Sequence, residues 1–201
     1  MAQERKINKN LPNILTVSRV ILVPVFMAIL MLPLFSDLVT RIVCGLLFFV
    51  ISMTDMIDGK LARKYELVSE FGKFMDPLAD KLLIFGAMLA LAVYGRGDLI
   101  FAVIMAFSTF IVLLRELAVT SLRMLFKGSG VIAANKLGKF KTGSQVVFVI
   151  AALVEPLFWY LPFWPDFLKY PILTYGSLAF MVVMTVVSGV NYFVIYLPKK
   201  K

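Results

Sequence analysis

The chain has no histidine and only one cysteine among its 201 residues. Without histidine, a histidine base, a phosphohistidine and a histidine metal ligand are all excluded. The single cysteine, Cys44, excludes an intramolecular disulfide and a cysteine metal cluster. Acidic residues are also few, 12 against 21 lysines and arginines, so the formal net charge is +9. Any acid–base or metal chemistry must therefore rely on carboxylates.

Hydrophobic residues make up 61% of the chain, whereas a soluble domain has about 45–50%. Because a membrane-spanning helix needs roughly 20 mostly apolar residues, this content suffices for about six spans. The composition excludes a soluble single domain, a disordered chain and a nucleic-acid-binding module. In a membrane protein, excess positive charge sets the topology and attracts anionic lipid. We therefore expect membrane lipids as partners and no nucleic acid.

Short polar, glycine-containing or proline-containing breaks divide the apolar sequence into segments long enough to span a membrane. We expect six transmembrane helices at about 12–35, 38–62, 73–95, 98–126, 140–161 and 166–197. The first ten residues are polar and basic, which predicts a cytoplasmic amphipathic segment on the membrane surface. The sequence thus predicts an all-α membrane protein with one integral-membrane domain over residues 1–201.

The basic residues are distributed unequally between the two ends of these spans. With the N-terminus in the cytoplasm, the cytoplasmic side carries Arg5, Lys6, Lys9, Arg19, Lys60, Arg63, Lys64, Lys73, Lys81, Arg123, Lys127, Lys136, Lys139, Lys141 and the tail 199–201. Only Arg41, Arg96 and Lys169 fall near the outer turns. This bias predicts that both termini face the cytoplasm.

Four of the twelve acidic residues stand where apolar sequence is expected: Asp55, Asp58, Asp76 and Asp80. Each costs about 3 kcal/mol near a bilayer centre and less toward the interface. Their mutual repulsion would add to that cost unless cations neutralise them. Divalent hard cations prefer oxygen ligands, and Mg²⁺ commonly uses carboxylates together with substrate phosphates. The four residues are therefore candidate metal ligands.

The spacing supports a shared site, because residues three or four apart lie on one helix face. Asp55 and Asp58 are three apart, Asp76 and Asp80 are four apart, and the connection at about 63–72 is polar and basic. Two antiparallel helices joined there would bring all four carboxylates together at the cytoplasmic end. An alternative without metal pairs them with the neighbouring bases Lys60, Arg63, Lys73 and Lys81.

Written out, the segment is Asp55-x2-Asp58-Gly59-x2-Ala62-Arg63-x8-Gly72-x3-Asp76-x3-Asp80. It resembles the signature of the CDP-alcohol phosphatidyltransferases at every fixed position. The resemblance implies an enzyme with six transmembrane helices, usually a homodimer. Members of this family transfer the phosphatidyl group of a CDP-linked lipid to an alcohol and release CMP. Two divalent cations, Mg²⁺ or Mn²⁺, are implied among the four aspartates.

The resemblance also assigns roles to single positions. Asp55, Asp58 and Asp76 correspond to shared metal ligands, and Asp80 to a ligand that is also the general base. The diphosphate-binding residues correspond to Gly59, Ala62, Arg63 and Gly72. The chemistry agrees, since two metals can hold the attacking and leaving oxygens of an in-line displacement. In a chain without histidine, a carboxylate is the natural base for the attacking alcohol.

Three further segments, 11–19, 115–123 and 133–142, resemble those of the bacterial phosphatidylglycerophosphate synthases, one branch of this family. This implies CDP-diacylglycerol as donor, sn-glycerol 3-phosphate as acceptor, and a bacterial cell membrane with the active site facing the cytoplasm. Physically, Arg115 lies inside an apolar helix and should face a polar cavity. With Arg123, Lys136 and Lys139 it is a candidate site for an acceptor that is itself a phosphate.

Several alternatives remain open. The acceptor could be phosphatidylglycerol, giving cardiolipin, or inositol phosphate. Lys136, Lys139 and Lys141 could serve only as topology anchors, and Arg115 could pair with Glu116 or another carboxylate. Asn13 and Thr16 could contact the donor nucleotide, or Asn13 could cap a helix. A cation transporter also has intramembrane carboxylates, but it would distribute them through the membrane depth.

Overall fold

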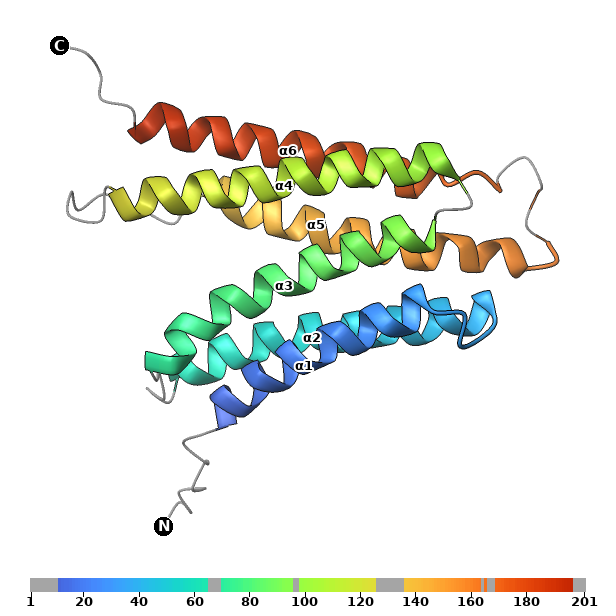
Figure 1. Ribbon diagram of the computed structural model, residues 1–201, viewed down its shortest axis with the longest axis horizontal. Coiled ribbons are helices and arrows are strands. Elements are labelled where there is room, and N and C mark those ends of the chain that lie inside the picture. The colour runs from blue at the N-terminus through green and yellow to red at the C-terminus, as the bar shows by residue number, and fades with distance from the viewer. Residues whose placement is uncertain are drawn as a thin grey trace. The chain divides into compact units, whose positions relative to one another are not determined.

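The computed structural model describes residues 11–64, 70–95, 98–125, 136–163, 165 and 169–196 (Figure 1). Within these ranges the side chains of residues 11, 12, 55–64, 70, 71, 73, 74, 136 and 196 are not described. The predicted amphipathic segment at residues 1–10 lies outside the described part of the chain.

The described chain consists of helices, which confirms the predicted all-α class. In order they are α1 (Leu11–Met31), α2 (Asp37–Lys64), α3 (Glu70–Tyr94), α4 (Leu99–Leu125), α5 (Lys136–Val154), the 3₁₀ helix η1 (Glu155–Tyr160) and α6 (Ile172–Tyr196). Six helical segments among the described residues are long and apolar enough to cross a membrane. The predicted number of spans is therefore confirmed by length and composition.

Two predicted boundaries are wrong because proline ends or delays a helix. The first helix ends at Met31 and not at 35, since the residue before Pro33 disfavours the helical conformation. The last helix begins at Ile172 and not at 166, directly after Pro171. The carbonyl of Pro171 accepts the first helical hydrogen bond, from the amide of Tyr175.

The predicted start of the fifth span is also wrong. Helix α5 begins at Lys136, four residues before the expected start at 140. The prediction marks the point where apolar sequence begins, whereas the helix extends beyond the apolar run through the polar residues before it. The other end tightens into η1, which has Pro156 in its first turn, a position where proline's missing N–H is tolerated.

The chain forms two compact units, Met1–Ala90 and Leu91–Lys201. In the first, α1 packs along α2 (Figure 1), and the rings of Phe26 and Phe48 lie 6.0 Å apart. Helix α3 approaches α1 closely at Gly86, where a Cβ atom would lie 2.8 Å from Cγ1 of Val23. Whether the whole chain is one functional domain stays a prediction.

In the second unit, α6 contacts both α4 and α5 (Figure 1). The carboxylate of Glu155 caps the beginning of α6. It accepts hydrogen bonds from the amides of Leu173 and Thr174 and from Oγ1 of Thr174, at 2.7–2.8 Å. An acidic group at a helix N-terminus is favourable because the helix dipole is positive there. This contact fixes α6 relative to the end of α5.

The surface of the helices is apolar and part of their interior is polar. Large apolar side chains such as Ile21, Phe107 and Val194 are more than half exposed, while Thr185 and Ser188 are completely buried. Small and polar residues inside, with apolar residues outside, are typical of helices packed in lipid. Together with the six apolar spans, this indicates a multi-pass membrane protein.

Candidate active site

The four predicted metal ligands lie on two helices joined by a short connection. Asp55 and Asp58 stand nine and six residues before α2 ends at Lys64. Asp76 and Asp80 stand six and ten residues after α3 begins at Glu70. At about 1.5 Å per residue, both pairs lie roughly 9–15 Å along their helices from the connection.

The directions of these helices follow from contacts in the first unit. Thr16 near the start of α1 contacts Asp76 near the start of α3, and Val23 farther along α1 lies beside Gly86 farther along α3. Helices α1 and α3 therefore run parallel. Helix α2, which packs on α1 after a short connection, runs in the opposite direction. The predicted antiparallel arrangement of α2 and α3 is thus present in the backbone.

Asp76 is the best described of the four carboxylates. Its side chain is exposed, and its Oδ1 atom accepts a hydrogen bond of 2.6 Å from Oγ1 of Thr16. Thr16 itself is only 1% exposed, so its hydroxyl orients one oxygen of Asp76 from inside the helix pair. Asp80, one turn farther along α3, is half-buried. Gly72, one turn earlier, is buried.

The side chains of Asp55 and Asp58 lie outside the described residues, and so do those of Ala62 and Arg63; Gly59 is also in this part of α2. Among the described side chains, no group of three or more acidic, histidine or cysteine residues is found. The described donors nevertheless fit a hard cation. Two carboxylates share one face of α3, and oxygen is the ligand that Mg²⁺ and Mn²⁺ prefer.

Asn13 is half-buried within α1. Since Leu11 and Pro12 are already helical, Asn13 is not the N-cap residue, and the capping alternative is wrong. Its predicted contact with the donor nucleotide stays a prediction, as does that of Thr16.

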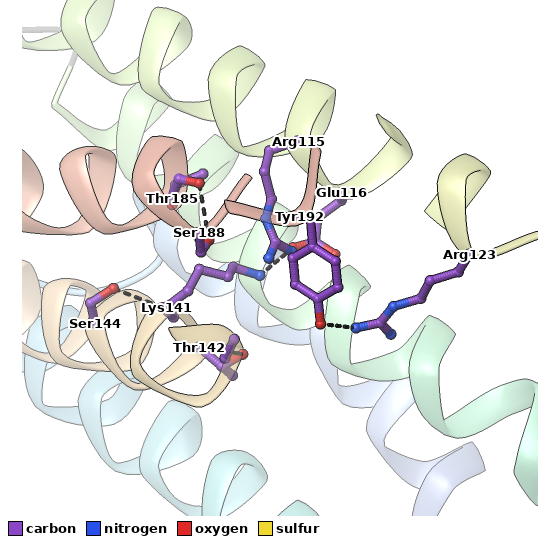
Figure 2. A network of polar contacts seen from close by, with 10 residues as sticks. Arg115, Glu116, Arg123, Lys141, Thr142, Ser144, Thr185, Ser188 and Tyr192 are labelled. Carbon is purple, nitrogen blue, oxygen red and sulfur yellow. Dashed lines mark hydrogen bonds and ion pairs between the residues drawn. The ribbon is translucent and has the colours of Figure 1, made fainter. Parts of the chain in front are cut away.

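A second polar group lies inside the second unit, on facing sides of α4, α5 and α6 (Figure 2). Nη1 of Arg115 lies 3.0 Å from Oε1 of Glu116. The same carboxylate oxygen accepts a hydrogen bond from Nζ of Lys141 on α5. The three side chains are nearly buried, with exposed fractions of 9–13%. The predicted alternative for Arg115, an ion pair with Glu116, is therefore present.

Tyr192 on α6 connects Arg115 with the second predicted arginine, Arg123 (Figure 2). The hydroxyl of Tyr192 accepts a hydrogen bond of 2.7 Å from Nη2 of Arg123. The Cζ atoms of Arg115 and Arg123 lie 5.6 and 5.2 Å from the centre of the Tyr192 ring. Both distances are within the range of a cation–π interaction. The structure thus brings the two arginines to one aromatic ring.

The lysine of α5 that contacts this group is Lys141, whereas Lys139 is exposed. Two residues are about 200° apart around a helix, so Lys139 points away from the face that carries Lys141. The side chain of Lys136, the first residue of α5, lies outside the described residues. The assignment of Lys136 and Lys139 to an acceptor site stays a prediction.

Neither Tyr192 nor Lys141 was among the residues predicted for the acceptor site. A pattern in the last apolar segment could have indicated Tyr192. Thr185, Ser188 and Tyr192 are spaced by three and four residues, so they form one polar stripe on an apolar helix. All three side chains are buried.

The chain is similar to known proteins over most of its length. The profile of the CDP-alcohol phosphatidyltransferase family matches residues 9–191. The chain is 40% identical over 196 residues to the CDP-diacylglycerol–glycerol-3-phosphate 3-phosphatidyltransferase of Bacillus subtilis, covering 92% of this chain and 93% of that protein. It is 38% identical to the protein of the same name from Rickettsia prowazekii, covering 74% and 77%. The chain therefore belongs to the CDP-alcohol phosphatidyltransferase family.

Proposed function

We propose that this enzyme transfers the phosphatidyl group of CDP-diacylglycerol to sn-glycerol 3-phosphate, giving phosphatidylglycerophosphate and CMP. The names of the relatives in Bacillus subtilis and Rickettsia prowazekii state this donor and acceptor. The four-aspartate motif of α2 and α3 supports the assignment of the donor. The cationic side chains of Arg115 and Arg123 on α4 and Lys141 on α5 support the assignment of the acceptor.

The observation that carries the acceptor assignment is the excess of positive charge around Tyr192. Arg115, Arg123 and Lys141 provide three cationic side chains; Glu116 is bonded to Arg115 and Lys141, and the Tyr192 hydroxyl to Arg123. Moreover, Nε of Arg115 is buried and has no hydrogen-bond partner in the described part of the chain. A buried donor without a partner costs about 1–3 kcal/mol. A phosphate oxygen of the acceptor would satisfy this donor and balance the charge.

At the donor end, the residues proposed to hold the two divalent cations are Asp55, Asp58, Asp76 and Asp80. The chemistry that Mg²⁺ or Mn²⁺ supplies to such a set is neutralisation of the diphosphate charge and polarisation of its phosphorus–oxygen bonds. Thr16 contributes by fixing the orientation of Asp76. The proposed diphosphate-binding residues are Gly59, Ala62, Arg63 and Gly72, with Asn13 and Thr16 near the nucleotide.

Asp80 is the proposed general base. It accepts the proton of the C1 hydroxyl of sn-glycerol 3-phosphate while that oxygen forms a bond to the phosphorus atom bearing diacylglycerol. The bond between this phosphorus and the bridging oxygen breaks, and the oxygen leaves with CMP. The guanidinium of Arg63 is proposed to offset the charge that develops on CMP. No covalent enzyme intermediate is required.

The proposed setting is a bacterial cell membrane, because the matched relatives are bacterial and the chain has six apolar spans. An even number of spans places both termini on one side, and the basic residues favour the cytoplasm for the termini and the aspartates. CDP-diacylglycerol reaches the site from the lipid phase, while sn-glycerol 3-phosphate is soluble in the cytoplasm. We further propose a homodimer, following the family resemblance.

The test is release of CMP from CDP-diacylglycerol by the purified enzyme in detergent–lipid micelles with Mg²⁺. Four acceptors are compared at equal concentration: sn-glycerol 3-phosphate, phosphatidylglycerol, inositol 1-phosphate and glycerol. We expect rapid release with sn-glycerol 3-phosphate and a product that carries its phosphate. Faster release with phosphatidylglycerol or inositol phosphate would reassign the acceptor. No release with any acceptor would favour a role outside group transfer, such as cation transport.

A further inference from the structure

The guanidinium groups of Arg115 and Arg123 converge on Tyr192 (Figure 2). Its side chain comes from α6, and it is only 3% exposed. Its ring lies near the guanidinium of Arg115, and its hydroxyl accepts a hydrogen bond from Arg123.

The shape of α6 around Tyr192 accommodates Arg115. Gly189 precedes Tyr192 by three residues, so both lie on the same face of the helix. A Cβ atom at Gly189 would lie 3.1 Å from Cγ of Arg115. The missing side chain therefore lets the stem of Arg115 lie directly against α6, while the ring of Tyr192 contacts the guanidinium at its end.

Two guanidinium groups that converge on one small region repel each other. Arg115 and Arg123 are eight residues apart on α4, and an unrestrained arginine has many side-chain conformers. The negative face of an aromatic ring attracts cations, and the hydroxyl holds Arg123 through a directional hydrogen bond. Tyr192 thus compensates part of the repulsion and restricts both side chains to orientations that converge.

We propose that Tyr192 is a positioning residue that holds Arg115 and Arg123 at the spacing needed to bind the phosphate of the acceptor. This inference rests on the proposed function, since it assigns the two arginines to an acceptor phosphate. Tyr192 acts on the acceptor through the arginines and takes no part in the chemical step. It therefore determines the preference for a phosphorylated acceptor over an uncharged alcohol.

The test begins with Tyr192→Phe, which keeps the ring and removes the hydroxyl. Because this hydrogen bond positions Arg123 and does not contact the acceptor, its loss should raise the KM for sn-glycerol 3-phosphate by only about 3- to 10-fold, less than the loss of a direct charge-assisted contact. The KM for CDP-diacylglycerol and kcat should remain within about 2-fold of the unchanged enzyme. Tyr192→Leu also removes the aromatic ring, and it should raise the KM for sn-glycerol 3-phosphate by a further factor of about 3 to 10.

A double variant separates positioning from packing. In Arg123→Ala the hydrogen bond between Arg123 and Tyr192 is already lost, so adding Tyr192→Phe should change the acceptor KM by less than about 2-fold. If Tyr192 only packs the helices, the factors by which the two substitutions raise the acceptor KM would multiply in the double variant. The matched control is Tyr175→Phe on the same helix, whose ring packs edge-on against Phe101 at 5.9 Å. This control should leave both KM values unchanged.

A second readout is the Kd for sn-glycerol 3-phosphate, measured by calorimetry without donor. Tyr192→Phe should weaken this binding by the same factor as it raises KM. Wild-type Kd and KM values in Tyr192→Phe would overturn the positioning role while leaving the proposed reaction intact. If the unchanged enzyme bound sn-glycerol 3-phosphate but released no CMP with it, the proposed reaction would fail, and the Kd shift would still decide the role of Tyr192. Absence of binding would overturn both.

Discussion

The hydroxyl of Thr16 on α1 donates a hydrogen bond of 2.6 Å to Oδ1 of Asp76 on α3, across 60 residues of sequence. Thr16 is buried and Asp76 is exposed. A partner behind a metal-binding carboxylate fixes its orientation, and removing such a partner typically weakens metal binding about 10- to 100-fold. The contact links a residue predicted to touch the donor with one predicted to bind metal.

The first prediction concerns this hydrogen bond. Thr16→Val removes the donor and keeps the shape, so the Mg²⁺ concentration for half-maximal activity should rise about 10-fold or more. Binding of Mn²⁺, followed by electron paramagnetic resonance, should weaken in parallel. Thr16→Ser keeps the hydroxyl and serves as control. A higher KM for CDP-diacylglycerol with unchanged metal dependence would instead make Thr16 a nucleotide-binding residue.

The second prediction concerns the metal ligands. Asp55→Asn and Asp76→Asn should each abolish turnover, because each removes a charged ligand proposed to be shared by two cations. EDTA should inactivate the unchanged enzyme, and added Mg²⁺ should restore it. The control is Asp37→Asn, at the opposite end of α2, where the carboxylate pairs with Arg41 at 2.9 Å. Full activity in chelator would refute the two-metal proposal.

The third prediction concerns the general base. Asp80→Asn keeps the size of the side chain and removes its ability to accept a proton, so kcat should fall about 100-fold or more. The Kd for CDP-diacylglycerol should change much less. Metal content is measured on the same sample, since loss of a ligand would also lower the rate. The proposal for Asp80 would be wrong if the variant bound CDP-diacylglycerol much more weakly but converted the bound substrate with an unchanged kcat.

The fourth prediction separates the two substrates. Arg115→Ala, Arg123→Ala or Lys136→Ala should raise the KM for sn-glycerol 3-phosphate about 10- to 150-fold, the value of one charge-assisted contact. The KM for CDP-diacylglycerol should change little in these variants. Arg63→Ala should show the reverse pattern. Arg41→Ala, which removes an ion pair with exposed Asp37, is the control. Equal weakening of both substrates by all three variants would contradict the acceptor assignment.

The fifth prediction concerns topology. A reporter that is active only in the cytoplasm, fused after Lys201, should be active, and so should one fused before Met1. The reason is the concentration of lysine and arginine on one side of six spans. A cysteine introduced at Leu99, an exposed residue at the start of α4, should react with a membrane-impermeant thiol reagent from outside. Reaction only from the cytoplasmic side would reverse the proposed orientation.

The sequence by itself determined the helical class, the number of spans and the position of the aspartates along their helices. These features depend on apolar runs and on residue spacing within one helix, both of which are local. The exact helix ends were less predictable. Pro33 shortened α1 and Pro171 delayed α6, whereas α5 extended through the polar residues before its apolar run. Apolar content marks the membrane-embedded part of a helix and not its ends.

Only the tertiary structure decided which side chains meet across helices. Arg115 and Arg123 could be paired by their spacing on α4, but their common partner Tyr192 is 69 residues from Arg123 in sequence. Likewise, Lys141 and not Lys139 contacts Glu116, because the rotation of α5 turns that face toward α4. Thr16 and Asp76 meet because α1 and α3 run in the same direction, with Gly86 leaving room for Val23 farther along. Such contacts depend on how packed helices are rotated about their axes and how closely they approach. The residue periodicity within a single helix does not predict either quantity.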